Sequence, residues 1–394
     1  MTACRFQLPN IEDLTKAQER VRGLSGDGCY LIVGGPGTGK SVIALLRARR
    51  HQRKDQVPDY VFLVYNQLLL EASRDLVDNA VHAGTWIAWF KVQFQQMLQQ
   101  SCPLLPGGKP YDLDWPAINT AIAAAGELPE PTTRYLIIDE GQDMPPDFYH
   151  ALANLGFENF FVVADQNQQI TDSHSTLREI QSALAIPAEQ RIELTDNYRN
   201  SYPVARLARA FCPHDPASPP PNLPARQRSA LKPLLVDYGP GCRLEFDGII
   251  TRLLKAADRN PAHLIGIFTA NNATRERYHQ RLMEIDVRLD HGRPRLLTYQ
   301  AGTAPRLNFS KGGICVINGQ SAKGLEFHTV FLADIDEYYC QAGNQAAREA
   351  LMRRFYVMVS RACERTILLR RADRPCPAEA ILPQDETILQ RWRT

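Results

Sequence analysis

The sequence has no long hydrophobic run, no cysteine pattern of a metal site and little net charge. No apolar stretch approaches the roughly 20 residues that a membrane span requires. The first residues also lack the apolar segment of a secretory signal. We therefore expect a cytoplasmic protein without a membrane partner. Nine cysteines are scattered without a C-x-x-C pair or a histidine at metal-ligand spacing, which argues against a zinc site.

The formal net charge is only +2, so composition alone does not indicate a nucleic-acid-binding protein. Basic residues gather at 47–54 and again at 348–374. Two interpretations fit these clusters: solvated helix ends, where cations are favoured, or contacts to phosphate groups. With 394 residues, 44% of them hydrophobic, the chain is long enough for two or three compact domains.

Short apolar runs alternate with helical or irregular segments between residues 30 and 199. This rhythm predicts a parallel, doubly wound α/β sheet. Its expected strands are Tyr30–Val33, Tyr60–Tyr65, Tyr135–Ile138, Phe160–Ala164 and Arg191–Leu194. A second α/β domain is expected from strands at His263–Thr269, Gly313–Ile317, Val330–Ala333 and Thr366–Leu369, with a helix over Gln345–Ala362.

A proline-rich stretch separates the two sets of strands and is the best candidate for a linker. We predict an N-terminal domain at 1–212, a linker at 213–233 and a C-terminal domain at 234–394. Residues 91–131 interrupt the strand and helix rhythm with glutamines and Pro-Gly turns. They are expected to form a small inserted subdomain of the first domain.

The segment that follows the first expected strand fits the pattern G-x-x-x-x-G-K-[ST] of a phosphate-binding loop. Glycines let backbone N–H groups close around phosphates, and the dipole of the following helix favours negative charge. Lys40 would meet the phosphate charge and Ser41 would bind Mg²⁺. The nucleotide-binding candidates in this segment are Gly35, Pro36, Gly37, Thr38, Gly39, Lys40 and Ser41.

Two carboxylates directly follow the expected strand Tyr135–Ile138. Asp139 is placed to hold the metal ion through water, and Glu140 to polarise the attacking water. The phosphate loop and this acidic pair together are far more specific than either alone. They predict a site that hydrolyses nucleotides and uses ATP and Mg²⁺.

Five further segments complete an ordered set: Leu14–Gln18, Ala164–Gln168, Asn197–Arg199, Lys323–Phe327 and Tyr356–Ala362. Together with the first two motifs, this set resembles the superfamily 1 helicases and is closest to the UvrD/Rep branch. The resemblance covers most of the chain. It implies two RecA-like motor domains with ATP in the cleft between them.

The resemblance also implies roles for single residues. Gln18 and Tyr198 would select and stack on adenine, while Gln168 would sense the γ-phosphate. Arg199 and Arg361 would neutralise charge on the transferring phosphoryl group. Gly324 and Glu326 match the motif that lies near the ribose and phosphates.

Nucleic-acid contacts are implied at Asn66, Thr85 and Trp89, where hydroxyls and amides would hold phosphates and aromatic rings would stack on bases. Core packing is the alternative for Trp89 and its neighbour Trp86. The chain departs from the family at 169–174, which lacks the usual Tyr and Trp. The stretch between Arg199 and Lys323 is too short for the large insertion of this branch.

We therefore expect an ATP-dependent helicase or translocase that acts on single-stranded nucleic acid, most simply DNA, with 3′ to 5′ polarity. A second hypothesis is an accessory NTPase subunit that senses nucleotide or nucleic acid and gates a partner such as a nuclease. A third is a P-loop scaffold without activity. The intact Lys40, Glu140, Arg199 and Arg361 argue against the third.

Overall fold

The structure of the chain is a computed structural model. It describes residues 8–52, 58–76, 81–168, 174–212, 219–226, 231–299, 311–340 and 343–392. These residues divide into two units. The N-terminal unit comprises residues 8–34 and 39–194, and the C-terminal unit comprises residues 35–38 and 195–392. The domain boundaries expected from the sequence remain a prediction, and part of the expected linker lies outside the described residues.

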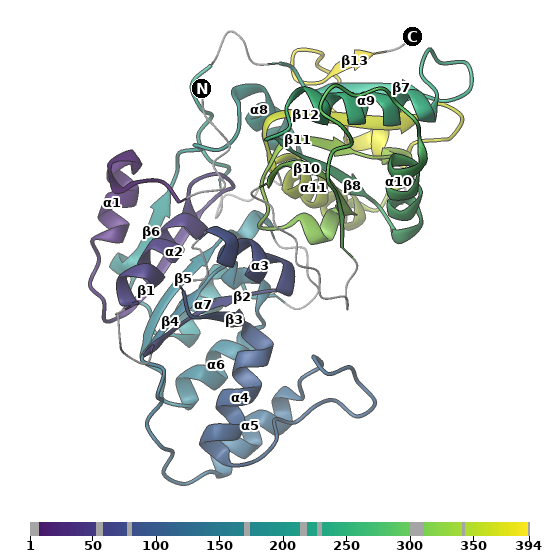
Figure 1. Ribbon diagram of the computed structural model, residues 1–394. Helices are drawn as coiled ribbons and strands as arrows, with labels where there is room; N and C mark the ends of the chain where they lie inside the picture. The colour runs from purple at the N-terminus through teal and green to yellow at the C-terminus, as the bar shows by residue number, and fades with distance from the viewer. Residues whose placement is uncertain are drawn as a thin grey trace. The chain divides into compact units, whose positions relative to one another are not determined.

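Six described strands form the sheet of the N-terminal unit, all parallel, in the order β3-β2-β4-β5-β1-β6 (Figure 1). The central strands are short runs of β-branched and aromatic residues, which suit a sheet that is buried on both faces. The strands are β1 Cys29–Gly34, β2 Tyr60–Val64, β3 Ala83–Thr85, β4 Tyr135–Ile138, β5 Asn159–Ala164 and β6 Arg191–Leu194.

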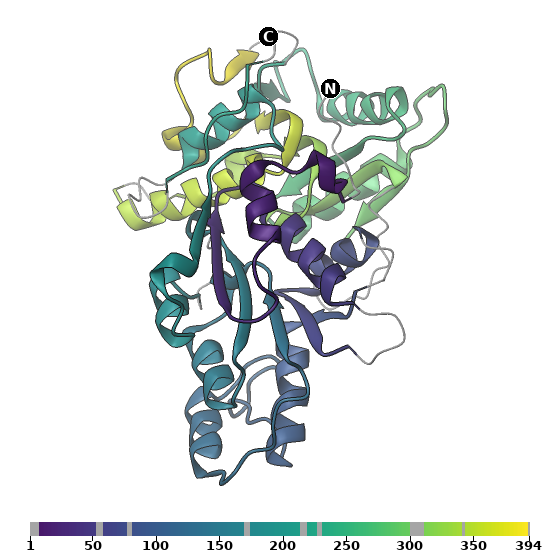
Figure 2. The same cartoon turned by 90° about the vertical axis from the view of Figure 1, so that its left-hand side faces the viewer.

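Helices cover both faces of this sheet. Successive strand residues point to opposite sides, so both faces carry apolar side chains that the helices bury. Ile32 belongs to the core shared with α1, α2 and α3, whereas Leu31 belongs to the core shared with α4 to α7. In Figure 2 the purple helices α1 and α2 face the viewer. The helices are α1 Lys16–Arg22, α2 Lys40–His51, α3 Gln67–Leu76, α4 Trp86–Leu98, α5 Trp115–Ala124, α6 Pro146–Asn154 and α7 Leu177–Ala183.

Aromatic rings join α4, α5 and α6. Phe90 of α4 is fully buried, 5.5 Å from the ring of Trp115 in α5 and 5.7 Å from that of Phe148 in α6. Trp86 is also buried and stacks on Trp115 with the ring planes 7° apart. The segment expected as an inserted subdomain therefore shares its core with the rest of the N-terminal unit.

Seven described strands form the sheet of the C-terminal unit in the order β13-β7-β12-β11-β8-β10-β9, and every pairing is parallel. They are β7 Leu234–Tyr238, β8 Leu264–Thr269, β9 Leu296–Thr298, β10 Gly313–Asn318, β11 Phe327–Leu332, β12 Ala362–Arg371 and β13 Gln390–Trp392. The two outermost strands, β9 and β13, are the shortest, and short edges limit pairing with other chains.

Two pairs of helices pack on this second sheet. Helices α9 (Phe246–Arg259) and α10 (Asn272–Glu284) share one core with the strands. Helices α8 (Tyr202–Phe211) and α11 (Gln345–Val359) contact each other and strands β11 and β12, with the rings of Phe211 and Phe355 5.3 Å apart. Each sheet is thus flanked by helices.

The expected fold class is confirmed: both units are α/β, with mostly parallel sheets flanked by helices, which is consistent with two RecA-like domains. All the expected strands exist. The sequence pattern does not predict β3, β7, β9 or β13, and the helix expected to reach Ala362 ends at Val359. Within the part of the chain that the structure describes, no helix combines the length and apolar character needed to cross a membrane.

The aromatic core gives a first prediction. Phe90→Ala should lower the free energy of unfolding by about 3–5 kcal/mol, because it removes a fully buried ring and leaves a cavity. Urea denaturation followed by tryptophan fluorescence measures the change. Val92→Ala on the same helix is the control, since Val92 is 49% exposed and its truncation should have little effect. Equal losses in the two variants would contradict the described packing of α4.

Candidate functional site

Loops that follow three adjacent strands carry the polar residues of the N-terminal unit. Strand β5 pairs with both β4 and β1, and all three run in the same direction. Their carboxyl ends therefore meet at one edge of the sheet, where ligands bind in open α/β folds. The segment after β1 leads to Lys40 and Ser41 at the start of α2, the segment after β4 carries Asp139 and Glu140, and the segment after β5 carries Asp165 and Gln168.

Positive φ angles shape the glycine-rich loop between β1 and α2. Gly37 has φ +78° and Gly39 has φ +89°, a region that side chains other than glycine rarely adopt. Gly39 is the N-cap of α2, so Lys40 begins the helix. A Cβ at Gly39 would collide with the side-chain amide of Gln18, so this glycine also allows close packing against α1.

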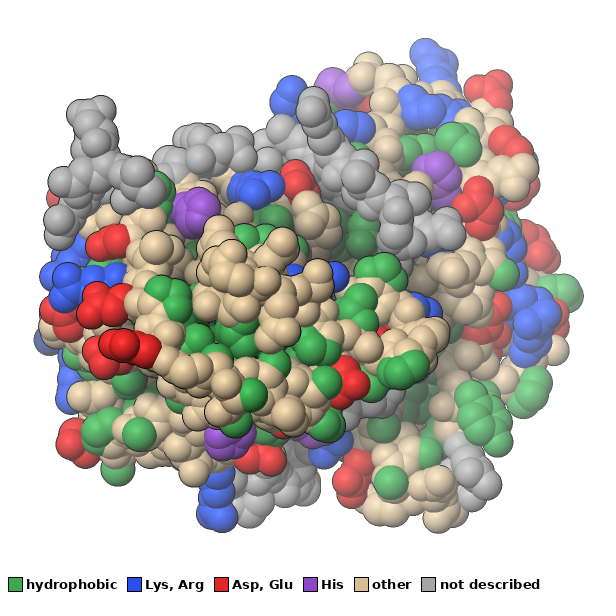
Figure 3. Space-filling view, turned by 90° about the horizontal axis from the view of Figure 1, so that it is seen from below, with side chains coloured by type: hydrophobic (Ala, Val, Ile, Leu, Met, Phe, Trp, Pro, Cys, Tyr) green, Lys and Arg blue, Asp and Glu red, His purple; other side chains and the backbone are tan. Residues whose placement is uncertain are grey.

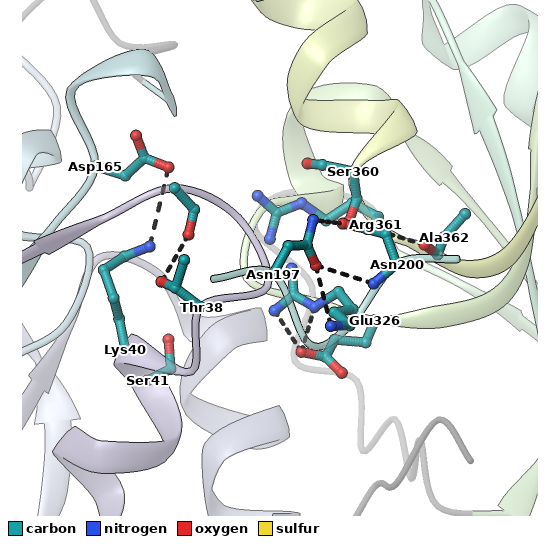
Figure 4. A network of polar contacts seen from close by, with 12 residues as sticks. Thr38, Lys40, Ser41, Asp165, Asn197, Asn200, Glu326, Ser360, Arg361 and Ala362 are labelled. Carbon is teal, nitrogen blue, oxygen red and sulfur yellow. Dashed lines mark hydrogen bonds and ion pairs between the residues drawn. The ribbon is translucent and has the colours of Figure 1, made fainter. Parts of the chain in front are cut away.

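Lys40 is buried and lies 3.9 Å from a carboxylate oxygen of Asp165. The side-chain amide of Gln168 donates to the same oxygen at 2.5 Å. Burial raises the pKa of Asp165, while the charge of Lys40 and the hydrogen bond from Gln168 act in the opposite direction. Asp165 therefore holds both Lys40 and Gln168 in place. Figure 4 shows its contact with Lys40.

Asp139 is buried at the end of β4 and is only partly satisfied by hydrogen bonds. Its Oδ1 accepts from the Ser41 hydroxyl at 3.1 Å and from the Glu140 backbone N–H at 2.9 Å. Its Oδ2 is buried without a hydrogen-bond partner among the described residues. Burial, and then the charge of Glu140, raise its pKa. A cation beside Oδ2 would relieve both effects.

Glu140 adopts the left-handed region, with φ +53°. A non-glycine residue in this conformation is uncommon and is frequently found at functional sites. The Gln142 amide donates to Glu140 Oε2 at 2.7 Å, and the carbonyl oxygen of the same amide accepts from the Asp165 N–H at 2.8 Å. Gln142 thereby fixes the orientation of the Glu140 carboxylate relative to the loop after β5.

The residues present fit a Mg²⁺ ion bound together with a nucleotide. Ser41 and Asp139 offer hard oxygen ligands, and Asp139 Oδ2 is a buried atom that needs a partner. Among the described residues, no group of three or more His, Cys, Asp or Glu side chains could hold a metal by itself. A bound ion would therefore take its remaining ligands from phosphate and water.

Residues 35–38 of the glycine-rich loop group with the C-terminal unit and contact the segment after β6. The Gly37 carbonyl accepts from the Tyr198 N–H at 2.9 Å. A Cβ at Gly37 would collide with the Asn197 side chain, and one at Gly35 would collide with the ring of Pro221. Thr38 donates from its hydroxyl to the Gly35 carbonyl at 2.9 Å. These two glycines are therefore required for close approach.

Arg199 and Glu326, both predicted to act on the nucleotide, form an ion pair with each other. The Arg199 Nε donates to Glu326 Oε1 at 2.7 Å, and its Nη2 contacts the same oxygen. Gly324, two residues before Glu326, has φ +78° and lies in the turn that leads into β11. The C-terminal unit therefore brings Arg199, Gly324 and Glu326 into one local site.

Arg361 lies between the end of α11 and the start of β12 and is almost fully buried. Its Nε donates to the Val357 carbonyl at 3.1 Å. The side-chain amide of Asn200 donates to the carbonyls on either side, of Ser360 at 2.9 Å and of Ala362 at 2.5 Å. Figure 4 shows this arrangement around Arg361.

The two residues predicted to recognise adenine differ in their surroundings. Gln18 is buried and closes the first turn of α1, where its Oε1 accepts from the Thr15 N–H at 3.1 Å. Tyr198 is 44% exposed, and its hydroxyl donates to Asp196 at 3.0 Å. An exposed ring is suited to stacking, whereas Gln18 already has a structural role. Recognition of adenine by both remains a prediction.

The predicted nucleic-acid contacts lie at the carboxyl ends of β2 and β3. Asn66 caps α3, where its Oδ1 accepts from the Leu69 N–H at 2.8 Å. Thr85 is the N-cap of α4. Trp89 is partly buried, with its ring 5.5 Å from that of Phe157. Trp86 belongs to the core, so the packing alternative holds for Trp86, while contacts by the other three remain a prediction.

Two arginines of the basic cluster after the phosphate loop are committed to the fold, while Arg49 is exposed and Arg53 and Lys54 lie outside the described residues. Arg47 is buried against the rings of Tyr30 and Phe161 and donates to the Ser25 and Gly26 carbonyls. Arg50 donates to the carbonyl of Arg22 at the end of α1 and to that of Leu24 in the loop that follows. Among the described residues on the face in Figure 3, Lys and Arg side chains are scattered rather than gathered in one patch.

Gln142, Asp165 and Asn200 were not predicted as site residues, although each lies in or beside a recognised motif. Gln142 and Asp165 connect the catalytic candidates to one another, and Asn200 holds the backbone around Arg361. The one feature of the sequence that could have identified them is their position after the carboxyl ends of expected strands. Their partners are distant in sequence, so the pattern alone could not identify the contacts.

Comparisons with known proteins support nucleotide binding. Residues 17–174 match the model of a protein family described as "AAA domain". A search among curated proteins gives no match. A solved structure described as the C-terminal domain of a possible DNA helicase from Lactobacillus plantarum WCFS1 is 17% identical and covers 49% of this chain and 97% of that chain. Its TM-score of 0.33 is too low to define a shared fold.

The partly unsatisfied Asp139 gives a second prediction. Asp139→Asn should weaken Mg²⁺-dependent binding of ADP about 10–100-fold, because the metal loses an anionic oxygen, while binding in EDTA should change little. Isothermal titration with ADP, with and without Mg²⁺, measures the difference. Asp27→Asn is the control, since Asp27 is exposed and pairs with Arg134 in the same unit. Retained Mg²⁺ dependence in Asp139→Asn would exclude Asp139 as a metal contact.

Proposed function

We propose that the chain is an ATP-hydrolysing superfamily 1 motor of the UvrD/Rep-like branch, without the large insertion, that acts on single-stranded DNA with 3′ to 5′ polarity. The observation that carries the proposal is the buried network in the N-terminal unit. In this network Lys40, Ser41, Asp139 and Glu140 lie at the carboxyl ends of adjacent strands, and Ser41 is hydrogen-bonded to Asp139. The ordered motifs in both units support the assignment to this superfamily.

In the proposed reaction, the chain's own groups bind the phosphates and take up a proton. Lys40 would exchange its 3.9 Å ion pair with Asp165 for the phosphates of ATP. The Glu140 carboxylate would accept the proton of the attacking water, with its orientation fixed by Gln142. Bound Mg²⁺ would neutralise charge on the phosphates. Gln168, held by Asp165, would sense the γ-phosphate.

The proposal also gives roles to two arginines, Arg199 and Arg361. Arg199 would leave Glu326 for the transferring phosphoryl group, which carries more negative charge than a carboxylate. Arg361 would supply the second positive charge. The roles of these two residues rest on the motifs in which they lie.

A second candidate is an NTPase subunit that senses nucleotide or nucleic acid and gates a partner such as a nuclease. Two observations favour it. Trp86, one of the aromatic residues near the expected strand-contacting segment, is in the core. Arg47 and Arg50 are used within the fold. The segment at 169–173, where the sequence lacks the family's aromatic pair, lies outside the described residues.

ATP hydrolysis by site variants tests the chemistry. Lys40→Ala should lower turnover about 10²–10³-fold and weaken ATP binding, because the phosphates lose a buried cation. Glu140→Gln should keep ATP affinity while turnover falls about 10²–10⁴-fold, because the proton acceptor is removed. A phosphate-release assay and a titration with a fluorescent ATP analogue measure the two effects. Normal turnover in Glu140→Gln would mean that another group activates the water.

Nucleic-acid dependence separates the two candidates. Turnover by the wild-type chain should rise on addition of single-stranded DNA, and the rise should weaken with salt because phosphate contacts release counterions. Single-stranded RNA and Glu140→Gln serve as controls. Turnover that is indifferent to both polymers, or that needs a second protein, would favour the gating subunit. Movement along DNA labelled at either end then tests the polarity.

A further inference from the structure

Asn200 occupies a buried position one residue beyond the motif Asn197–Arg199 and links it to the turn that carries Arg361. Only 5% of Asn200 is exposed. Its amide nitrogen donates to the carbonyls of Ser360 and Ala362, at 2.9 and 2.5 Å. All these residues belong to the C-terminal unit. One side chain thus forms hydrogen bonds with the backbone on both sides of Arg361 (Figure 4).

A second asparagine orients the amide of Asn200. The Asn197 nitrogen donates to Asn200 Oδ1 at 2.8 Å, which leaves the Asn200 nitrogen directed at the two carbonyls. Asn197 Oδ1 accepts from the backbone N–H groups of Arg199 and Asn200, both at 3.1 Å. The same oxygen would collide with a Cβ at Gly37, so it packs closely against this glycine. The pair therefore connects the phosphate-loop segment, Arg199 and the Arg361 turn.

Hydrogen bonds hold the turn around Arg361 through its N–H groups and through its carbonyls: the Ser360 N–H donates to the Tyr356 carbonyl and the Arg361 N–H to that of Met358. Helix α11 ends at Val359 and β12 begins at Ala362, so the turn between them is two residues long. The Arg361 carbonyl accepts from the Phe327 N–H at 2.9 Å. Asn200 fixes the carbonyls before and after it. The three consecutive carbonyls at 360–362 are therefore tied to β11 and to the segment after β6.

We propose that Asn200 is a positioning residue for Arg361: its amide sets the backbone of the turn and thereby where the guanidinium can reach. The inference rests on the proposed function, in which Arg361 stabilises the transferring phosphoryl group. Because Asn197 also lies against Gly37, a nucleotide that presses on the phosphate loop would act on the same pair of amides. Asn200 touches neither nucleotide nor metal in this role.

The rival explanation is that Asn200 only satisfies two buried carbonyls, which would otherwise cost stability. The two explanations differ in what they predict for catalysis. A stabilising amide would change the free energy of unfolding and leave the turnover of the folded protein alone. A positioning amide would lower the turnover through Arg361 and would have no effect once the Arg361 guanidinium is absent.

A double-mutant cycle with Asn200→Asp and Arg361→Gln tests the proposal. Asn200→Asp keeps the shape and the acceptor for Asn197 but loses the donor to both carbonyls. We expect its kcat for ATP to fall about 100-fold with little change in nucleotide affinity. A displacement of the Arg361 guanidinium by about 1 Å is enough for a loss of this size. The double variant should be no slower than Arg361→Gln alone, since the two residues act as one unit.

Asn200→Ser and Asn260→Asp complete the set. Serine can donate to one of the two carbonyls, so Asn200→Ser should have an intermediate kcat and provides a variant if Asn200→Asp fails to fold. Asn260 is exposed at the end of α9 in the same unit, so Asn260→Asp controls for the added charge. Thermal unfolding of each variant, with and without ADP, shows whether the folded state is intact.

Hydrogen exchange supplies a readout that does not depend on turnover. In Asn200→Asp, peptides that cover 358–364 should exchange faster than in the wild type, while peptides of the N-terminal sheet should be unchanged. Unchanged exchange, a kcat equal to the wild type, or a double variant much slower than Arg361→Gln would each overturn the positioning role. Normal turnover in Arg361→Gln would instead remove the assigned role of Arg361 and the inference with it. A wild-type chain without ATPase activity would contradict the proposed function itself.

Discussion

The burial of two consecutive carboxyl groups is the constraint on which the N-terminal site depends. Asp139 and Glu140 are 1% and 5% exposed, so each needs a compensating donor or cation. The left-handed conformation of Glu140 turns the backbone immediately after β4 and sends the two side chains to different partners. Asp139 meets the hydroxyl of Ser41, and Glu140 meets the amide of Gln142. The elements that surround this pair are arranged to supply those groups.

The parallel order of the sheet makes this compensation possible. Because β5 lies between β4 and β1, Asp165 can contact Gln142 from one neighbouring loop and Lys40 from the other. Buried polar groups connected in this way are rigid, since displacement of one leaves others unsatisfied. The C-terminal unit also contains a network of buried polar side chains, but its groups are neutral: the amides of Asn197 and Asn200 join three separate segments.

The fold and much of the site follow from the sequence because their signals are local. Runs such as Tyr60–Val64 are apolar and β-branched or aromatic, so they predict buried strands. β3 and β9 have three residues each and carry too little pattern to be found. The contacts of Gln142, Asp165 and Asn200 depend on which strands become neighbours. Similarly, the sequence allows a structural or a phosphate-binding role for the arginines after the phosphate loop, and burial selects the structural role for Arg47.

The ion pair of Arg199 and Glu326 makes an internal carboxylate the competitor of every anion that approaches Arg199. Chloride or another weakly held monovalent ion interacts with the guanidinium less strongly than the Glu326 carboxylate does. A polyphosphate, with several oxygens and a higher charge density, can displace the carboxylate. Under the proposed function, the carboxylate of Glu326 would therefore exclude small monovalent anions from Arg199, and only a ligand of high charge density would replace it.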